Sequence, residues 1–253
     1  MIGIVIPAHD EERYLDGCLD AIRQAGSHAG LRGESVCVVV VLDHCRDNTH
    51  AIATAHAEAT AHPGAGCRVE MIELDARNVG AARAAGADRL LAQGARWLAF
   101  TDADTRVSPE WLVAQLRLGF DVVCGTVSVE DWSVHHDHPT LLRQHFEHRY
   151  ADQDGHRHIH GANLGVCALA YRRAGGFAPL TCSEDVALVA ALENCGASIA
   201  WSAAPRVTTS ARRDARAHGG FGDTLIRYAA AASQNAQPSL AIKPITPFTP
   251  PIP

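Results

Sequence analysis

The stretch W-L-A-F-T-D-A-D-T at residues 97–105 decides the fold class. Its first five residues predict a strand that is buried on both faces, and two carboxylates follow at the end of that strand. Ligands of open α/β sheets bind beyond the carboxyl ends of the strands. The stretch therefore predicts an α/β protein with a ligand site at Asp102 and Asp104.

The spacing of these two aspartates suits a metal ion. Alternate residues of an extended chain share one face, so Asp102 and Asp104 approach the same ion if the chain stays extended. Carboxylate oxygens at this edge favour Mg²⁺ or Mn²⁺ that bridges to a diphosphate. The alternative is a turn with two solvated aspartates.

Strand-like and helix-like segments alternate before residue 97. The predicted strands are residues 2–7, 36–42 and 69–74, and the predicted helices are residues 11–25, 48–62 and 80–94. The apolar residues of the first helix share one face at helical spacing. The alternation predicts a parallel, doubly wound half with right-handed connections.

The second half follows a different pattern. Ser108 and Pro109 predict the start of a helix that continues to Leu118, because serine caps helices and proline suits their first position. Further predicted elements are a strand at 121–129, helices at 140–150 and 184–195 with Gly196 as the stop, and a helix after Gly222. We expect one domain over residues 1–237 with a mixed sheet, divided into two halves at residues 1–105 and 106–237. Residues 238–253 hold six of the twelve prolines and predict a flexible tail.

Polar residues also follow the first and second predicted strands. Residues 7–12 read P-A-H-D-E-E, and Asp43 ends the second strand. Asn78 begins the next helix, which carries Arg83 in its first turn. Each residue alone suits a helix cap or a solvated surface, but together they predict a nucleotide site at one edge of the sheet.

Composition narrows the partners. The chain of 253 residues has a net charge of −6 and a pI near 6.2, which disfavours nucleic acid and anionic membranes. No stretch approaches the length of a transmembrane segment, and the first residues lack the basic region of a signal peptide, so we expect a cytoplasmic protein. The single lysine, Lys243, nearly excludes any mechanism that needs one.

Cysteine and histidine do not form a metal motif. The eight cysteines are scattered without C-x-x-C spacing, which predicts reduced thiols, several of them buried. Eight of the fifteen histidines lie between His135 and His160. Zinc binding is one interpretation of this segment, and a solvated loop or helix is the favoured one.

The motifs together resemble those of family 2 glycosyltransferases of GT-A fold. The resemblance rests on I-P-A-H-D-E-E, the acidic end of the second strand, N-V-G-A-A-R-A-A-G and T-D-A-D-T in the first half. In the second half it rests on G-A-N-L-G at 161–165, R-R-A-G-G-F at 172–177 and S-E-D-V-A-L at 183–188. Each motif is weak alone, and their shared order over residues 1–225 is specific.

The resemblance implies a GT-A fold with a mixed central sheet flanked by helices. Residues 1–105 would be its Rossmann-like half, which binds the nucleotide-sugar donor, and residues 106–237 its acceptor-binding half. It implies a hexosyltransferase-type enzyme that uses a UDP- or GDP-sugar, with Mn²⁺ or Mg²⁺ as cofactor. The implied donor contacts are Pro7, Ala8, Glu12, Asp43, Arg83 and Asp102. The implied metal ligands are Asp104 and Asp102, with His218 as a candidate third ligand. The implied sugar or acceptor contacts are Gly161, Ala162, Asn163 and Trp132, and the implied catalytic pair is Glu184 and Asp185, with Asp185 as general base.

The resemblance leaves the acceptor open, which is a sugar, a lipid or a small molecule. Transfer with inversion follows if Asp185 is the base, and retention is the alternative. One departure lies after the second strand, where D-H-C-R-D at 43–47 replaces the usual D-D-G-S. His44 and Arg46 therefore put base contacts beyond Asp43 in doubt.

Two other classes compete with this interpretation. T-D-A-D-T also resembles the motif of haloacid-dehalogenase-type phosphohydrolases, in which Asp102 would be the nucleophile. That motif normally lies on the first strand, and Lys243 is the only candidate for the lysine that such enzymes use. A nucleotide- or zinc-binding module without catalysis is the second alternative, and metal-dependent release of a nucleoside diphosphate would exclude it.

Overall fold

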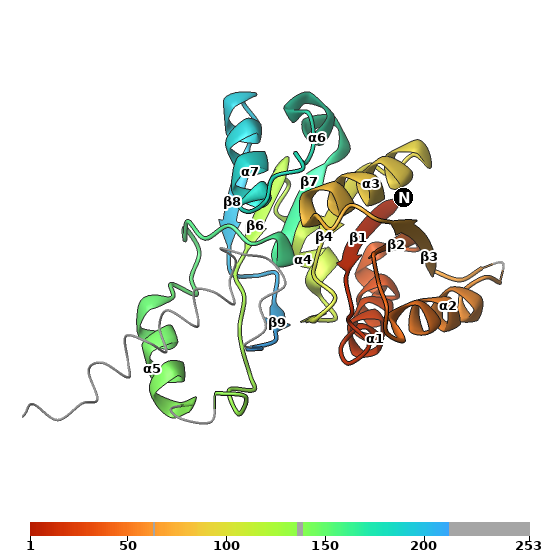
Figure 1. Ribbon diagram of the computed structural model, residues 1–253. Helices are drawn as coiled ribbons and strands as arrows, with labels where there is room; N and C mark the ends of the chain where they lie inside the picture. Colours follow the sequence, from red (N-terminus) through yellow and green to blue (C-terminus); the bar gives the residue numbers. More distant parts are fainter. Residues whose placement is uncertain (63, 136–138, 213–253) are drawn as a thin grey trace, which may run out of the picture.

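A seven-stranded sheet lies between two layers of helices in the computed structural model, which describes residues 1–62, 64–135 and 139–212 (Figure 1). The strands lie in the order β3 (Cys67–Leu74), β2 (Val36–Asp43), β1 (Ile2–Ala8), β4 (Trp97–Phe100), β7 (Leu164–Cys167), β6 (Val122–Gly125) and β8 (Ile199–Ser202). Two short strands, β5 (Thr105–Val107) and β9 (Val207–Thr209), pair in a second sheet.

The first half confirms the predicted doubly wound arrangement. Strands β3, β2, β1 and β4 pair in parallel. Their connecting helices are α1 (Leu15–Gly26), α2 (Thr49–Ala59) and α3 (Val79–Ala92). Helix α1 begins four residues after its predicted start, because residues 11–14 form a turn in which Leu15 N–H donates to the carbonyl of Glu11.

The second half confirms the mixed sheet. Strand β7 runs antiparallel to both β4 and β6, and β8 runs parallel to β6. The helices are α4 (Trp111–Arg117), α5 (Pro139–Arg149), α6 (Ala168–Ala174) and α7 (Glu184–Asn194), with short 3₁₀ helices η1 (Ala29–Leu31) and η2 (Gly161–Asn163). The predicted strand at 121–129 was too long, because β6 ends at Gly125 and Ser128 makes only an isolated bridge to Thr208.

Alternate residues of the central strands divide between two cores. Ile4 of β1 faces the core under α1 and α4, whereas Val5 faces the core under α3, α6 and α7. Helix α3 approaches the sheet closely at Gly86, where an added Cβ would lie 2.5 Å from a methyl carbon of Val5. This contact holds the N-terminus of α3 beside the carboxyl ends of β1 and β2.

Helix α5 stands away from the sheet, and a long connection leads to it from β6 (Figure 1). The helix predicted after Gly222, the tail at 238–253 and His218 lie outside the described residues. Among the helices of the described part of the chain, none has the length and apolar character needed to cross a membrane.

Candidate functional site

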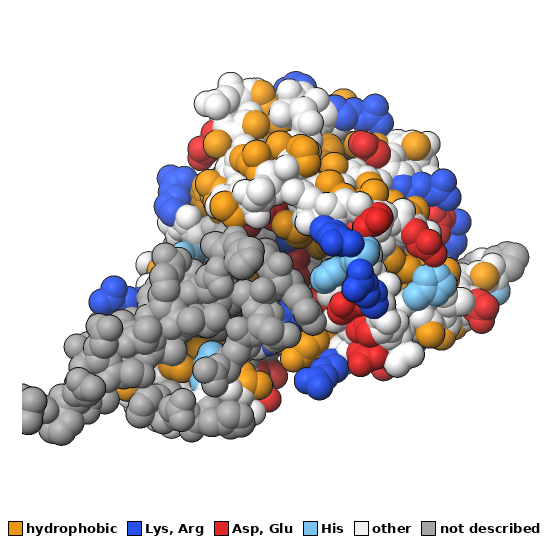
Figure 2. Space-filling view, in the orientation of Figure 1, with side chains coloured by type: hydrophobic (Ala, Val, Ile, Leu, Met, Phe, Trp, Pro, Cys, Tyr) orange, Lys and Arg blue, Asp and Glu red, His pale blue; other side chains and the backbone are white. Residues whose placement is uncertain are grey.

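The loops at the carboxyl ends of β1, β2 and β3 hold strained residues. Asp10, His44 and Arg77 have φ angles of 54°, 57° and 49°, and Ser183, just before α7, has 59°. Non-glycine residues rarely adopt this left-handed conformation, and such strain concentrates at functional sites. Basic, acidic and histidine side chains gather on the face of the molecule turned to the viewer in Figure 2.

Asp43 at the end of β2 is buried and organises the neighbouring loop. Its Oδ1 accepts the backbone N–H groups of Ala76 and Arg77, and its Oδ2 accepts that of Asn78, each at 2.8 Å. The Asn78 side chain in turn caps α3 by accepting the N–H of Ala81. Asp43 therefore fixes the loop between β3 and α3, and its contact with a base stays a prediction.

His44, which stands where the sequence departs from the family pattern, lies beside His9 of the loop after β1. The rings of His9 and His44 are nearly parallel, with centroids 6.1 Å apart. His9 Nδ1 lies 2.7 Å from the carbonyl oxygen of Asp43, and His44 Nδ1 lies 2.8 Å from a carboxylate oxygen of Asp75. The departure thus adds one imidazole, that of His44, next to His9.

Glu12 joins the loops after β1 and β2. Its Oε2 accepts hydrogen bonds from the backbone and the side chain of Asn48, at 3.1 and 2.9 Å. Asp47 accepts the Glu12 N–H at 3.0 Å. Of the other predicted donor contacts in this loop, Ala8 is buried and Pro7 is partly exposed. The structure brings all of them to one edge.

Arg83 is buried beneath this edge and pairs with two carboxylates. Its guanidinium donates to Glu184 and, at 2.6 Å, to Asp102. Burial opposes the positive charge, but the two carboxylates outweigh it and raise the pKa of Arg83. A Cβ at Gly161 would lie 2.3 Å from the guanidinium, so the glycine makes room for it, and the ring of Phe177 lies 5.7 Å away.

The two aspartates after β4 do not lie on an extended chain, and that expectation was wrong. The Thr105 N–H donates to the carbonyl of Asp102, which closes a turn. Asp104 accepts from the hydroxyl of Ser210 at 2.6 Å and lies 3.1 Å from Nε of Arg212. Burial raises the pKa of Asp104, and the charge of Arg212 opposes that rise.

Glu11 is a site residue that the sequence analysis missed. Its buried carboxylate accepts two hydrogen bonds from Nη1 of Arg212, at 2.8 and 2.7 Å. The sequence predicts a donor contact for the neighbouring Glu12, which stays a prediction. Arg212 thereby connects the loop after β1 to the segment after β9. Neither spacing nor a motif predicts its pairing with Glu11.

The predicted catalytic pair lies at the N-terminus of α7, where its two carboxylates have different surroundings. Glu184 is buried against Arg83, and burial raises the pKa of its carboxyl against the lowering effect of that arginine. Asp185 is partly exposed, and its Oδ2 accepts the N–H of Gly161 at 2.8 Å. Of the two carboxylates, Asp185 is therefore the one placed to meet a ligand.

Asn163 and Trp132 hold the fold together at their positions. The Asn163 amide donates to the carbonyls of Thr126 and Pro205, and its oxygen accepts the indole N–H of Trp111. Trp132 is buried in a cluster near α5, formed with Leu142, Phe146 and Ala211. Ala162 is also buried. Contacts of these residues with a sugar or an acceptor stay predictions.

The carboxylate oxygens at this edge are of the type that a divalent cation prefers, but as they stand they do not form a complete set of metal ligands. Asp102 and Asp104 supply the hard oxygens that Mg²⁺ and Mn²⁺ prefer. Each carboxylate is, however, paired with an arginine, and no three His, Cys, Asp or Glu side chains among the described residues are grouped to hold a metal. A cation at Asp104 therefore has to compete with Arg212.

The histidine-rich segment agrees only in part with the predicted solvated loop or helix: His148 lies exposed on α5, whereas other histidines of the segment are packed. His156 is buried, and His158 stacks on Tyr150 with ring centroids 4.2 Å apart. Nε2 of His160 lies 2.9 Å from the Tyr150 hydroxyl, and the buried His135 contacts the carbonyl of Ala211. Tyr150, which directly follows α5, and Trp201 of β8 are aromatic rings that contact the histidines at 156–160.

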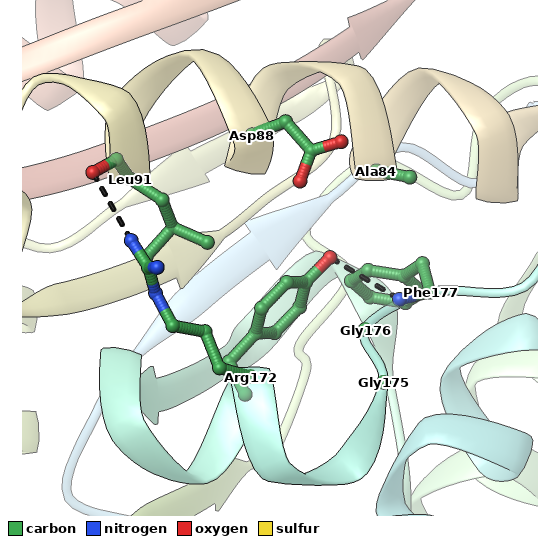
Figure 3. Close-up of a pocket in the computed structure, with 8 residues that line it drawn as sticks. Ala84, Asp88, Leu91, Arg172, Gly175, Gly176 and Phe177 are labelled. Carbon is green, nitrogen blue, oxygen red and sulfur yellow. Dashed lines mark hydrogen bonds between the residues drawn. The ribbon is translucent and has the colours of Figure 1, made fainter.

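A cavity of about 240 Å³ lies away from this edge, between α3 and α6 (Figure 3). Arg172 donates to the carbonyl of Leu91 on its rim, and the Phe177 N–H donates to the Tyr171 hydroxyl. Its volume is below that of most ligand sites, and its lining includes none of the predicted site residues. The acidic edge of the sheet is thus the better candidate.

The parallel strands β3-β2-β1-β4, the antiparallel β7 beside them and the acidic carboxyl edge define the GT-A class of α/β proteins. The model of glycosyl transferase family 2 matches residues 3–174, and the chain belongs to this family. The membership favours a transferase over the phosphohydrolase alternative. A comparison with curated proteins found no match.

Solved glycosyltransferase structures share the fold at low identity. The chain is 16% identical to TarS 1–349 of S. aureus in complex with UDP-GlcNAc, with a TM-score of 0.59 over 94% of this chain and 68% of that chain. It is 17% identical to the mannosyltransferase PcManGT of Pyrobaculum calidifontis in complex with GDP-Man and Mn²⁺. There the TM-score is 0.59 over 94% of this chain and 76% of that chain.

Proposed function

We propose that the protein transfers a hexosyl group from a UDP- or GDP-sugar to an acceptor hydroxyl, with a divalent cation at Asp104 and Asp102. The family supports transfer, and solved relatives of the same fold are complexes with UDP-GlcNAc or with GDP-Man and Mn²⁺. The observation that carries the proposal is the meeting of Asp102, Glu184 and Asp185 around one buried arginine, Arg83. Asp104 lies close enough to Asp102 for the two charges to interact.

The leaving diphosphate is the first chemical demand of this reaction. A divalent cation, when bound, would act as a Lewis acid, and its positive charge would stabilise the leaving diphosphate. Asp104 and Asp102 are the residues that would hold it. The N-terminus of α3, whose backbone is fixed by Asn78 and Asp43, adds a favourable end for negative groups nearby.

The acceptor hydroxyl is the second demand, since it has to lose a proton as it attacks. Asp185 is our candidate base, because Glu184 is held by Arg83 whereas Asp185 reaches the partly exposed end of α7. The N–H of Gly161 orients its carboxylate. A positioned base contributes roughly 10²–10⁴-fold to such a step. Attack from the face opposite to the diphosphate gives inversion.

The first test separates donor binding from transfer. Thermal shifts are measured with UDP- and GDP-sugars, with and without Mn²⁺, for the unchanged protein, Asp104→Ala and Asp185→Asn. We expect Asp104→Ala to lose the metal-dependent shift. Asp185→Asn keeps the shift but releases nucleoside diphosphate roughly 10²–10⁴-fold more slowly. Asp20→Asn, an exposed change on α1, is the matched control.

Three results would contradict parts of this proposal. Transfer at the unchanged rate by Asp185→Asn overturns the base assignment. A metal-dependent shift that survives in Asp104→Ala overturns the cation site. A donor-specific shift without release of nucleoside diphosphate, with any donor tested, favours a binding module over an enzyme.

A further inference from the structure

Two arginines pair with four carboxylates at the acidic edge, so the negative charges outnumber the positive ones there. Arg83 pairs with Asp102 and Glu184, and Arg212 pairs with Glu11 and Asp104. Glu11 and Asp104 have side chains only 5% and 9% exposed, so water screens their charges poorly. Buried carboxylates of this kind require a nearby positive charge.

We propose that the Arg212 guanidinium occupies the position of the divalent cation at Asp104 until the donor binds. The cation then replaces the guanidinium at Asp104, and Arg212 pairs with the donor diphosphate. The inference rests on the proposed function and adds a positioning residue to it. The guanidinium Nε lies 3.1 Å from Asp104 Oδ2, the oxygen that also accepts from the hydroxyl of Ser210. A cation on this carboxylate and the guanidinium repel each other at such distances.

Arg212 is better placed to leave than Arg83. Arg83 is held by two carboxylates, lies under Gly161 and has a side chain only 4% exposed. The Arg212 side chain is 16% exposed and belongs to the segment after β9, outside the seven-stranded sheet. The two arginines therefore have different tasks, and only Arg212 exchanges.

The released guanidinium has a natural partner in the donor. A diphosphate brings negative charge to the same edge, and arginine binds phosphate oxygens through two parallel hydrogen bonds. When the cation takes the place of Arg212 at Asp104, the arginine keeps Glu11 as one partner. The diphosphate then replaces Asp104 as its second anionic partner. The divalent cation and the two negative charges of the donor diphosphate offset each other, so the exchange leaves the net charge of the edge unchanged.

The proposal predicts opposite effects of one substitution on two ligands. Binding of Mn²⁺ alone is measured by the EPR signal of free Mn²⁺, and binding of UDP and GDP at saturating Mn²⁺ by calorimetry. Arg212→Gln should bind Mn²⁺ about tenfold more tightly and the nucleotide about tenfold more weakly, within the usual range of coupling between two ligands. Arg206→Gln, which removes an exposed partner of Asp152, should match the unchanged protein for both ligands.

Arg212→Lys separates charge from shape, since it keeps the positive charge and loses the planar fork. It should keep the Mn²⁺ affinity of the unchanged protein and still weaken nucleotide binding. Circular dichroism before each titration verifies that the variants are folded.

Three outcomes overturn the inference. Equal Mn²⁺ affinity of Arg212→Gln and the unchanged protein overturns the exchange and leaves the proposed function standing. Tighter Mn²⁺ binding with unchanged nucleotide affinity overturns the pairing with the diphosphate. Binding of Mn²⁺ by neither protein overturns both this inference and the cation of the proposed function.

Discussion

Asp43 shows how one carboxylate shapes the site through backbone atoms. It accepts three N–H groups from residues 76–78, which turns the loop before α3 toward the end of β2. An asparagine offers only one accepting oxygen and would point its NH₂ group at a backbone N–H. The charge and both oxygens are therefore needed.

We expect Asp43→Asn to lower the free energy of unfolding by about 1–3 kcal/mol, because buried N–H groups lose their acceptor. Donor binding should weaken as well, since the loop carries the N-terminus of α3. Urea unfolding and calorimetry with UDP or GDP measure the two effects. Unchanged stability, compared with the exposed Asp20→Asn, would show that the loop holds without this carboxylate.

Single residues were easier to predict than their partners. The sequence places Asp102, Asp104 and Glu184 at a site because their motifs are local. Arg212 donates to Glu11 across 201 positions of the chain, and no local spacing predicts such a pair. Whether Glu11 or Glu12 is buried and pairs with Arg212 depends on which side of a turn faces the sheet, and only the folded chain shows this.

Helices and strands with strong local signals were predicted well. Asn78 caps α3, and Gly196 adopts φ = 74° just after α7, as their residue types indicate. Strand β7 and helix α6 went unassigned because they are four and seven residues long and follow each other directly. A short apolar run suits either structure, so periodicity cannot separate them.

The segment 156–160 predicts a pH effect on stability. Burial, followed by the charges of His158 and His156, lowers the pKa of His160 from 6.5 to about 3. Between those values the unfolded chain binds a proton that the folded chain does not. Above pH 6.5 this histidine therefore does not reduce the free energy of unfolding. Below pH 6.5 the free energy of unfolding decreases by up to about 1.4 kcal/mol per pH unit because of this group.

His160→Gln tests this effect, because glutamine does not titrate and keeps an acceptor for the Tyr150 hydroxyl. Urea unfolding at several pH values between 7.5 and 5 should show a shallower fall than in the unchanged protein. His50→Gln, on the exposed face of α2, should leave the slope as it was. Equal slopes for all three proteins would contradict the assignment to His160.

At the scale of the whole molecule, Arg83 connects the expected donor and acceptor halves. It belongs to α3, and its partners come from the end of β4 and from α7. The division of the chain near residue 105 stays a prediction. The doubly wound half was predictable because four parallel strands and their helices carry clear patterns, and the GT-A fold was implied by the resemblance of the motifs. The pairing of β7 between β4 and β6 required the folded chain.

A double-mutant cycle measures this connection. Arg83→Met should cost about 3–5 kcal/mol of unfolding free energy, because Glu184 is left charged and buried. Arg83→Met combined with Glu184→Leu should cost less than the two single changes added together. Arg143→Met, which breaks an exposed pair on α5, should cost under about 1 kcal/mol. Simple additivity at residues 83 and 184 would contradict the coupling.

The shared arginine also constrains recombination between relatives. A chimera that takes residues 106–212 from another family member inherits a new α7, and with it a new neighbour for Arg83. We expect such hybrids to fold only where the incoming helix presents a carboxylate at position 184 and the incoming loop keeps the space at Gly161. An exchange of residues 106–212 between family members therefore has to preserve the ion pair of Arg83 with residue 184 and the glycine at position 161.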